Sequence, residues 1–110
     1  MPTSTGDQQE YWHVGHVSFS VNGRTASLQA YLPTEGGNYF IPFVDATAPA
    51  ETYGAGRYLE PEDLGDGRLH LDFNLAYNPY CAYNDRWSCP IPPRQNRLPV
   101  RIEAGEKNFH

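Results

Sequence analysis

The dipeptide Asn22-Gly23 constrains the fold of this chain more than any other feature, because of the two runs that flank it. HVSFSV (residues 16–21) lies before it and ASLQAYL (residues 26–32) after it, and in both runs apolar and polar residues alternate. A two-residue type I′ turn needs positive φ at both central positions, which Asn and Gly tolerate best. The sequence therefore predicts a β-hairpin over residues 16–32.

The rest of the chain predicts further short strands separated by turns. The candidate strands are NYFIPFVDA, GRYLE, RLHLDFNLAY and RLPVRIEAGEKNF, at residues 38–46, 56–60, 68–77 and 97–109. Pro42 cannot donate to a strand ladder, so it is expected at an edge, at a bulge or where its missing N–H goes unused. Between the second and third strands, PEDLGDG (residues 61–67) predicts a helical turn and then a tight turn at Asp66-Gly67. In the last strand, Val100 and Ile102 are expected to point inward.

The alternation in residues 68–77 is the cleanest in the chain. Apolar residues are predicted on one face and polar residues on the other, namely Leu69, Leu71, Phe73 and Leu75 against His70, Asp72 and Asn74. If the polar face meets solvent, it has no special role. If it lines the mouth of a barrel, it forms a binding site, since buried polar groups need partners.

Composition supports the same fold class. The chain has 110 residues, with ten glycines and ten prolines that favour many turns, and 14% aromatic residues that supply buried area. A chain of this length forms one domain. We expect residues 1–10 to fray and residues 11–110 to form a single all-β domain. Its architecture is predicted as a small antiparallel barrel or sandwich of about six strands, with a long Pro-rich loop.

Charge excludes some classes of partner. The net charge is −5, so the chain lacks the basic surface that general nucleic-acid binding or anionic-membrane binding requires. The first ten residues have neither the basic start nor the apolar run of a signal peptide, and no segment has the length of a membrane span. A cytoplasmic location is the default expectation.

Both cysteines fall in NPYCAYNDRWSC, residues 78–89. Seven residues separate Cys81 from Cys89, which is wider than the usual zinc-ligand spacing, and nothing in the sequence brings further ligands to them. No metal or cofactor is assigned. Four interpretations stay open, namely inert buried thiols, a disulfide, a metal clip, or a reactive Cys81 thiolate.

Arg57 follows two glycines in TYGAGRYL, a stretch with no nucleotide-binding pattern. It could pair internally with Asp45 or with Asp72. With a tyrosine on each side, it could equally form an anion clamp.

Three longer stretches make the chain similar to a known family. PFVDAT with ETYGAGRYL, LDFNLAYNPYCAYN, and CPIPPRQNRLPVRIEAGEK resemble the bacterial and archaeal proteins catalogued as domain of unknown function 1684. The resemblance covers roughly residues 40–107. It implies that the chain corresponds to the C-terminal part of that family, whose members carry a further segment upstream. It implies no activity.

The resemblance marks residues that lie within the family's motifs. Many are polar residues or tyrosines, which fits either a polar pocket or a hydrogen-bond network: Asp45, Tyr53, Gly54, Gly56, Arg57, Tyr58, Asp72, Asn74, Tyr77, Asn78, Cys81, Tyr83, Cys89, Asn96, Glu106 and Lys107.

Three functions follow as hypotheses. The first is a pocket for a small polar or anionic ligand, with Cys81 near its edge, lined by Arg57, Asp72, Asn74, Tyr77, Asn78 and Tyr83. The second is a thiol-dependent enzyme or redox protein that uses Cys81, with Arg57 or His70 lowering the pKa of the thiol. The third is an interaction module or homodimer without catalysis.

Overall fold

The computed structural model describes residues 11–21, 23–34, 37–54, 56–65, 67–79 and 91–107. The regular structure in these residues is strand apart from two short 3-10 helices, which confirms the all-β class. The strands are β1 (Tyr11–Val21), β2 (Arg24–Pro33), β3 (Ile41–Phe43), β4 (Arg57–Leu59), β5 (Glu62–Asp63) and β6 (Leu69–His70). The 3-10 helices are η1 (Phe73–Leu75) and η3 (Arg94–Asn96). Residues 1–10, which were predicted to fray, lie outside the described residues.

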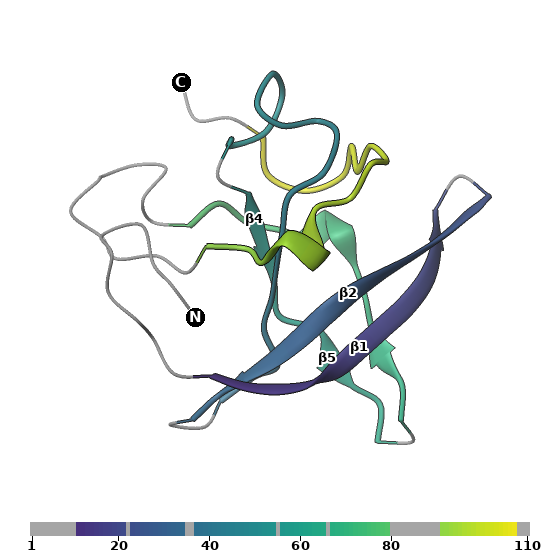
Figure 1. Cartoon of the computed structure of the whole chain (residues 1–110), viewed down its shortest axis with the longest axis vertical. Helices are drawn as coiled ribbons and strands as arrows, with labels where there is room; N and C mark the ends of the chain where they lie inside the picture. Colours follow the sequence, from purple (N-terminus) through teal and green to yellow (C-terminus); the bar gives the residue numbers. More distant parts are fainter. Residues whose placement is uncertain are drawn as a thin grey trace.

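The predicted hairpin is confirmed, and it is longer than the alternation indicated. β1 and β2 pair antiparallel from Val21 opposite Arg24 to Tyr11 opposite Pro33, with a bulge between His13 and Gly15. The pair runs diagonally across the molecule in Figure 1. Gly23 has a φ of 78°, as a primed two-residue turn requires.

Two isolated antiparallel bridges extend the three two-stranded sheets, so that the chain follows the path of an antiparallel meander. Tyr31 pairs with Phe40 between β2 and β3, β3 pairs with β4, Tyr58 pairs with Tyr77, and β5 pairs with β6. Among the described residues, no pairing joins β6 to β1, so the predicted barrel is not closed. Pro42 lies in β3 opposite Tyr58, and its carbonyl accepts a hydrogen bond from Asn96 rather than from β4. Its missing N–H is therefore not needed in the ladder.

Two sequence predictions were wrong between residues 61 and 77. The helical turn predicted before Asp66-Gly67 is instead strand β5. The turn of the β5–β6 hairpin follows it, where Gly65 and Gly67 have positive φ and the Gly65 N–H bonds the Asp63 carboxylate. The predicted strand at residues 68–77 survives only as β6 and is followed by η1. The Asp72 carboxylate accepts the Asn74 N–H and begins this 3-10 turn.

The change of period at η1 also changes which side chains are buried. Leu75 was expected to face the same way as Leu69 and Leu71, but it is 70% exposed. A 3-10 turn has three residues per turn, so the two-residue alternation cannot continue through it.

The predicted last strand, residues 97–109, is not regular strand in the part that is described. Arg97 makes one parallel bridge with Val44, and Pro99 has no N–H to continue a ladder. Val100 and Ile102 are nevertheless buried, as the pattern predicted.

One hydrophobic core lies inside the meander. Its buried members come from most of the strands and from the C-terminal segment: Leu28, Ala30, Ile41, Phe43, Leu59, Ala76, Leu98, Val100 and Ile102. A second cluster, on the other face of β3 and β4, consists of Phe40 and Tyr58 with Tyr11 and Tyr77 packed against them. Burial raises the pKa of Tyr58 far above the usual tyrosine value.

Candidate functional site

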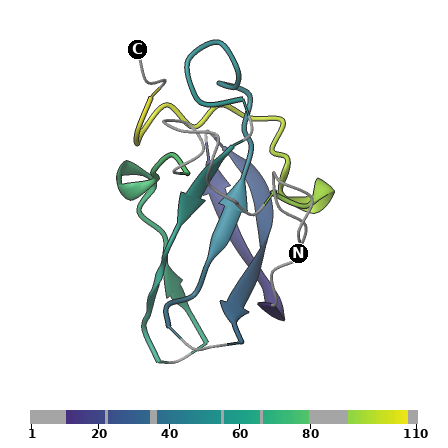
Figure 2. The ribbon, with the colours of Figure 1, turned by 90° about the vertical axis from the view of Figure 1, so that its left-hand side faces the viewer.

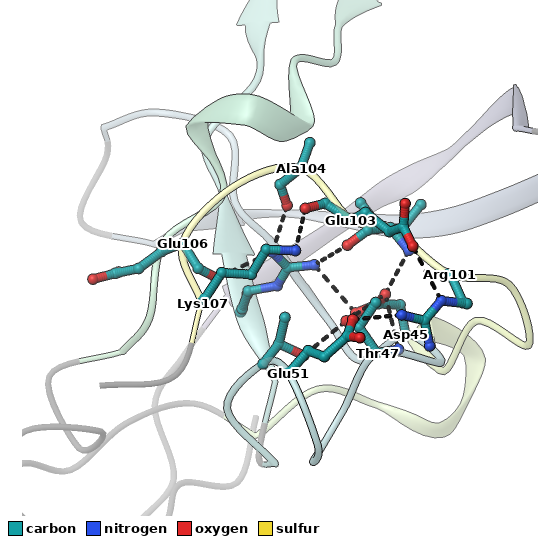
Figure 3. A network of polar contacts seen from close by, with 11 residues as sticks. Asp45, Thr47, Glu51, Arg101, Glu103, Ala104, Glu106 and Lys107 are labelled. Carbon is teal, nitrogen blue, oxygen red and sulfur yellow. Dashed lines mark hydrogen bonds and ion pairs between the residues drawn. The ribbon is translucent and has the colours of Figure 1, made fainter. Parts of the chain in front are cut away.

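Arg57, the first residue of β4, lies in the interior with 1% of its side chain exposed. One terminal nitrogen donates to the carbonyl oxygens of Ala104 at 2.6 Å and Glu106 at 3.2 Å. The other donates to the Asp45 carboxylate at 3.2 Å and to the Ile102 carbonyl at 2.8 Å. Figure 3 shows the polar network to which Asp45, Ala104 and Glu106 belong. The guanidinium therefore holds three carbonyls of the C-terminal segment in place of a neighbouring strand.

Asp45 completes this arrangement from the other side. Its carboxylate accepts the Ile102 N–H at 2.6 Å, the Thr47 N–H at 3.2 Å and the Thr47 hydroxyl at 2.8 Å. The Thr47 hydroxyl also lies 2.9 Å from that of Thr52. The carboxylate is 1% exposed and has several donors in addition to Arg57. Buried charges need such pairing, so the geometry fits a structural role.

Asn78 extends the same network along the C-terminal segment. Its backbone N–H donates to the Glu106 carboxylate at 2.6 Å, and its side-chain amide donates to the Lys107 carbonyl at 3.0 Å. Glu106 in turn donates its backbone N–H to the Ala76 carbonyl at 2.9 Å. We call Asp45, Thr47, Arg57, Asn78 and residues 102–107 the Arg57 network.

Tyr77, Asp72 and Asn74, which were also predicted to bind a ligand, make other contacts. The Tyr77 hydroxyl donates to Glu60 at 2.8 Å at the surface, Asp72 caps η1, and Asn74 is exposed. Arg57 pairs with Asp45 and not with Asp72, which answers the question that the sequence left open. Ligand binding by these residues stays a prediction, and Arg57 would have to leave its buried partners to take part.

Cys81 and Tyr83 lie outside the described residues, as does most of NPYCAYNDRWSC. The four interpretations of the cysteines and the thiol-enzyme hypothesis stay predictions. In the described part of the chain, no cluster of three or more His, Cys, Asp or Glu residues could hold a metal ion. No helix within that part is long and apolar enough to cross a membrane.

The open seam between β1 and β6 holds two adjoining hollows, of about 220 and 370 Å³. Both are lined by His16 and Val17 of β1 and by residues 67–69 of the β5–β6 hairpin. The smaller one extends to Tyr39 and Asp63, among others, and the larger one to Ser18, Leu64, His70 and Leu71. We call the two hollows together the β1–β6 groove.

The β1–β6 groove combines polar and apolar groups. Arg68 lines both hollows and brings a guanidinium, while His16 and His70 bring imidazoles. Val17 and Leu69 pack against the core from the two sides. The β5–β6 hairpin, which lines the groove, lies at the end of the molecule opposite the loop after β3, as Figures 1 and 2 show.

The sequence did not single out this groove. In the sequence, Arg68 begins the predicted strand at residues 68–77, Tyr39 belongs to the predicted strand at residues 38–46, and His16 belongs to the predicted hairpin. Period-2 alternation shows which face a side chain takes, but not which two strands meet at the seam of an open meander. The one available signal was His70, on the polar face of its strand.

A third hollow, of about 350 Å³, lies between Val21, Phe73 and residues 101–104. Its one cationic side chain among the described lining residues, Arg101, is bonded to the carboxylates of Glu51 and Glu103. The Glu51 carboxylate raises the pKa of Arg101. The arginine of this hollow is thus already paired with two carboxylates.

Comparisons with known proteins place the chain in a family. The model of the family described as "Protein of unknown function (DUF1684)" matches residues 1–107, so the resemblance extends over the N-terminal hairpin as well. The solution NMR structure of the uncharacterized protein from gene locus rrnAC0354 of Haloarcula marismortui is 44% identical, with a TM-score of 0.72. The match covers 88% of this chain and 56% of that one, so this chain spans about half the length of that protein. No curated protein matches. The family match over nearly the whole sequence shows that the chain belongs to the DUF1684 family of proteins of unknown function.

Proposed function

We propose that the chain binds a small polar or anionic ligand, and that the β1–β6 groove is where it binds. The observation that carries the proposal is the position of Arg68, which lines both adjoining hollows of an open concave surface. Arginine presents a planar set of donors that matches a carboxylate or phosphate bidentately. A ligand in either hollow would meet this side chain.

The remaining lining residues suit a ligand with one charged end. His16 and His70 offer ring nitrogens, and Tyr39 a hydroxyl, at the edges of the groove. Val17, Leu69 and Leu71 offer apolar surface for the body of a ligand. The Asp63 carboxylate also lines the smaller hollow, where it accepts the Gly65 N–H at 2.8 Å. Ligand pockets commonly combine an apolar lining with a few polar groups in this way.

The Arg57 network supports this function less well. Its arginine and carboxylate are 99% buried and bonded to each other and to the backbone. A ligand there would have to displace bonds that hold residues 102–107.

The test is an NMR titration of the ¹⁵N-labelled chain with acetate and, separately, with inorganic phosphate. We expect amide shifts to cluster in residues 14–18 and 63–71. Arg68→Ala should weaken binding about ten-fold or more, because a charge-assisted hydrogen bond contributes about 1.5–3 kcal/mol.

The matched control is His13→Ala, on the same strand. His13 lines neither hollow, and its ring nitrogen lies 2.6 Å from the Gln29 side-chain oxygen, so this variant should bind as the parent does. Shifts that cluster in residues 102–107 would move the site to the Arg57 network. The absence of residue-specific shifts at millimolar ligand would refute the proposal.

A further inference from the structure

β1 has an open edge beside the groove. Within the described part of the chain, β2 is its one strand neighbour. On β2, the backbone N–H and carbonyl of Gln29 both bond the Asn96 side chain, and those of Tyr31 bond Phe40. These two residues of β2 therefore direct their backbone groups away from β1.

The register then shows which groups of β1 face outward. In an antiparallel pair, residues directly opposite each other either exchange both hydrogen bonds or both point away. His16 is opposite Gln29, so its N–H and carbonyl point to the open side, and by alternation so do those of Ser18 and Ser20. The backbone groups of these three alternate residues of β1 can therefore hydrogen-bond an added strand; we call them the three docking points.

This edge lacks the usual protection against strand pairing. Natural edge strands are commonly guarded by charged side chains, prolines or bulges. The eleven residues of β1, YWHVGHVSFSV, include no charged residue other than histidine and no proline. The bulge lies between His13 and Gly15, before the three docking points. Trp12 and Val14 also expose 62% and 46% of their surface.

The open edge and the β1–β6 groove share residues. His16 and Ser18 line the larger hollow, opposite Arg68 and Leu71. A strand added to β1 would alternate its side chains, so every second one would point to the same side. An acidic side chain placed there can meet Arg68, and apolar ones can meet Leu71.

We propose that the ligand of the groove is an extended peptide segment with an acidic side chain, which adds to β1 as a further strand. This inference rests on the proposed function of the groove and names the class of its ligand. Backbone hydrogen bonds would give affinity, and the acidic side chain would give specificity. Charge favours this occupant over a second copy of the chain pairing through β1, because β1 contains no carboxylate to meet Arg68.

Amide hydrogen exchange tests the proposal directly. The probe is an acetylated and amidated heptapeptide of alternating valine and threonine with a central glutamate. At a peptide concentration ten times Kd, exchange at His16, Ser18 and Ser20 should slow about ten-fold. The backbone N–H groups of Val17 and Phe19 already point to β2, so the exchange of these amides should change far less.

Two control peptides separate the backbone contribution from the charge. A version N-methylated at every residue keeps every side chain but has no backbone N–H to donate along either edge, and it should give no protection. A version with glutamine in place of glutamate should bind more weakly to the parent chain. With Arg68→Ala, the glutamate and glutamine versions should bind equally.

The outcomes distinguish this inference from the proposed function. Acetate binding at the groove without peptide protection of His16, Ser18 and Ser20 would overturn the inference and leave the proposed function standing. Absence of both acetate and peptide binding would refute both. Protection of the same amides without peptide, rising with protein concentration, would show that a second copy occupies the edge and would overturn the peptide proposal.

Discussion

Two arginines lie in very different surroundings: Arg57 is the first residue of β4, and Arg68 comes just before β6. Arg57 is 1% exposed and bonded to a carboxylate and three carbonyls, and it follows Gly56, where an added Cβ would lie 2.5 Å from the Phe43 carbonyl oxygen. Arg68 is exposed and lines two open hollows. Burial fixes the first as part of the structure, while the second lies on a surface that a ligand can reach.

The two regions also differ in how many of the family's motif residues they contain. Asp45, Arg57, Asn78 and Glu106 all belong to motifs that the sequence shares with the family, and all lie in the Arg57 network. Arg68 and His16 lie outside the motif residues but line the groove. The architecture therefore explains these four motif residues.

The largest expected effect comes from breaking the buried pair. Arg57→Met should lower the free energy of unfolding by about 3–5 kcal/mol, because it leaves the Asp45 charge buried without its partner. The measurement is urea denaturation followed by fluorescence. The matched control is Arg101→Met, which removes an arginine that is 47% exposed and paired with Glu51, and should change stability little. Equal losses in the two variants would contradict the structural role of Arg57.

The next effect separates close packing from backbone conformation. Gly56→Ala and Gly67→Ala both place a side chain at positive φ, 105° and 83°. At Gly56, the new Cβ would lie 2.5 Å from the Phe43 carbonyl oxygen, whereas at Gly67 it meets open space. We expect a loss of about 1–2 kcal/mol for Gly67→Ala and about 1–3 kcal/mol more for Gly56→Ala.

Thermal denaturation of both glycine variants gives the comparison. If Gly67→Ala destabilises the protein as much as Gly56→Ala, the β5–β6 hairpin turn is as tightly constrained as the backbone beside Arg57. The contrast between the two regions then fails.

The smallest effect is a pH dependence of the unfolding free energy that comes from Tyr58, the neighbour of Arg57 in β4. Burial, with smaller contributions from Tyr11 and Tyr53, raises the pKa of Tyr58 above its unfolded value of about 10. The folded state therefore favours the neutral phenol. The resulting stability is fully present below pH 10 and is lost as pH rises above it, by up to about 1.4 kcal/mol per pH unit.

Tyr58→Phe isolates this contribution. The difference in unfolding free energy between the parent and Tyr58→Phe should shrink as pH rises from 9 to 11, because only the parent loses the phenol's contribution. A difference that stays constant with pH would show that Tyr58 ionises as easily in the folded chain as in the unfolded one.

The sequence predicted the parts of the fold that depend on local pattern. The Asn22-Gly23 turn, the alternation around it and the inward Val100 and Ile102 follow from backbone sterics and hydrophobic period. It failed at residues 68–77, where the Asp72 side chain competes with the ladder for the Asn74 N–H and starts a 3-10 turn.

The candidate site was less predictable, for a physical reason. The sequence named Asp45 as one of two partners for Arg57, and the structure selects it. The β1–β6 groove, however, arises where β1 and the β5–β6 hairpin come close without pairing. His16 lines it from β1 and Arg68 from the hairpin. Local pattern carries no information on such a long-range approach.

The bonds from Arg57 to residues 102–106 have a consequence for synthesis of the chain on the ribosome. The guanidinium is made 45 residues before the first carbonyl that it bonds and 49 before the last. Until those carbonyls emerge, Arg57 can pair with Asp45, but its other N–H donors would be buried without their carbonyl partners. The nascent chain can form the β1–β2 hairpin early, because that pairing is local. The Arg57 end of the core can close only after residue 106 has left the ribosome, and therefore later than the hairpin.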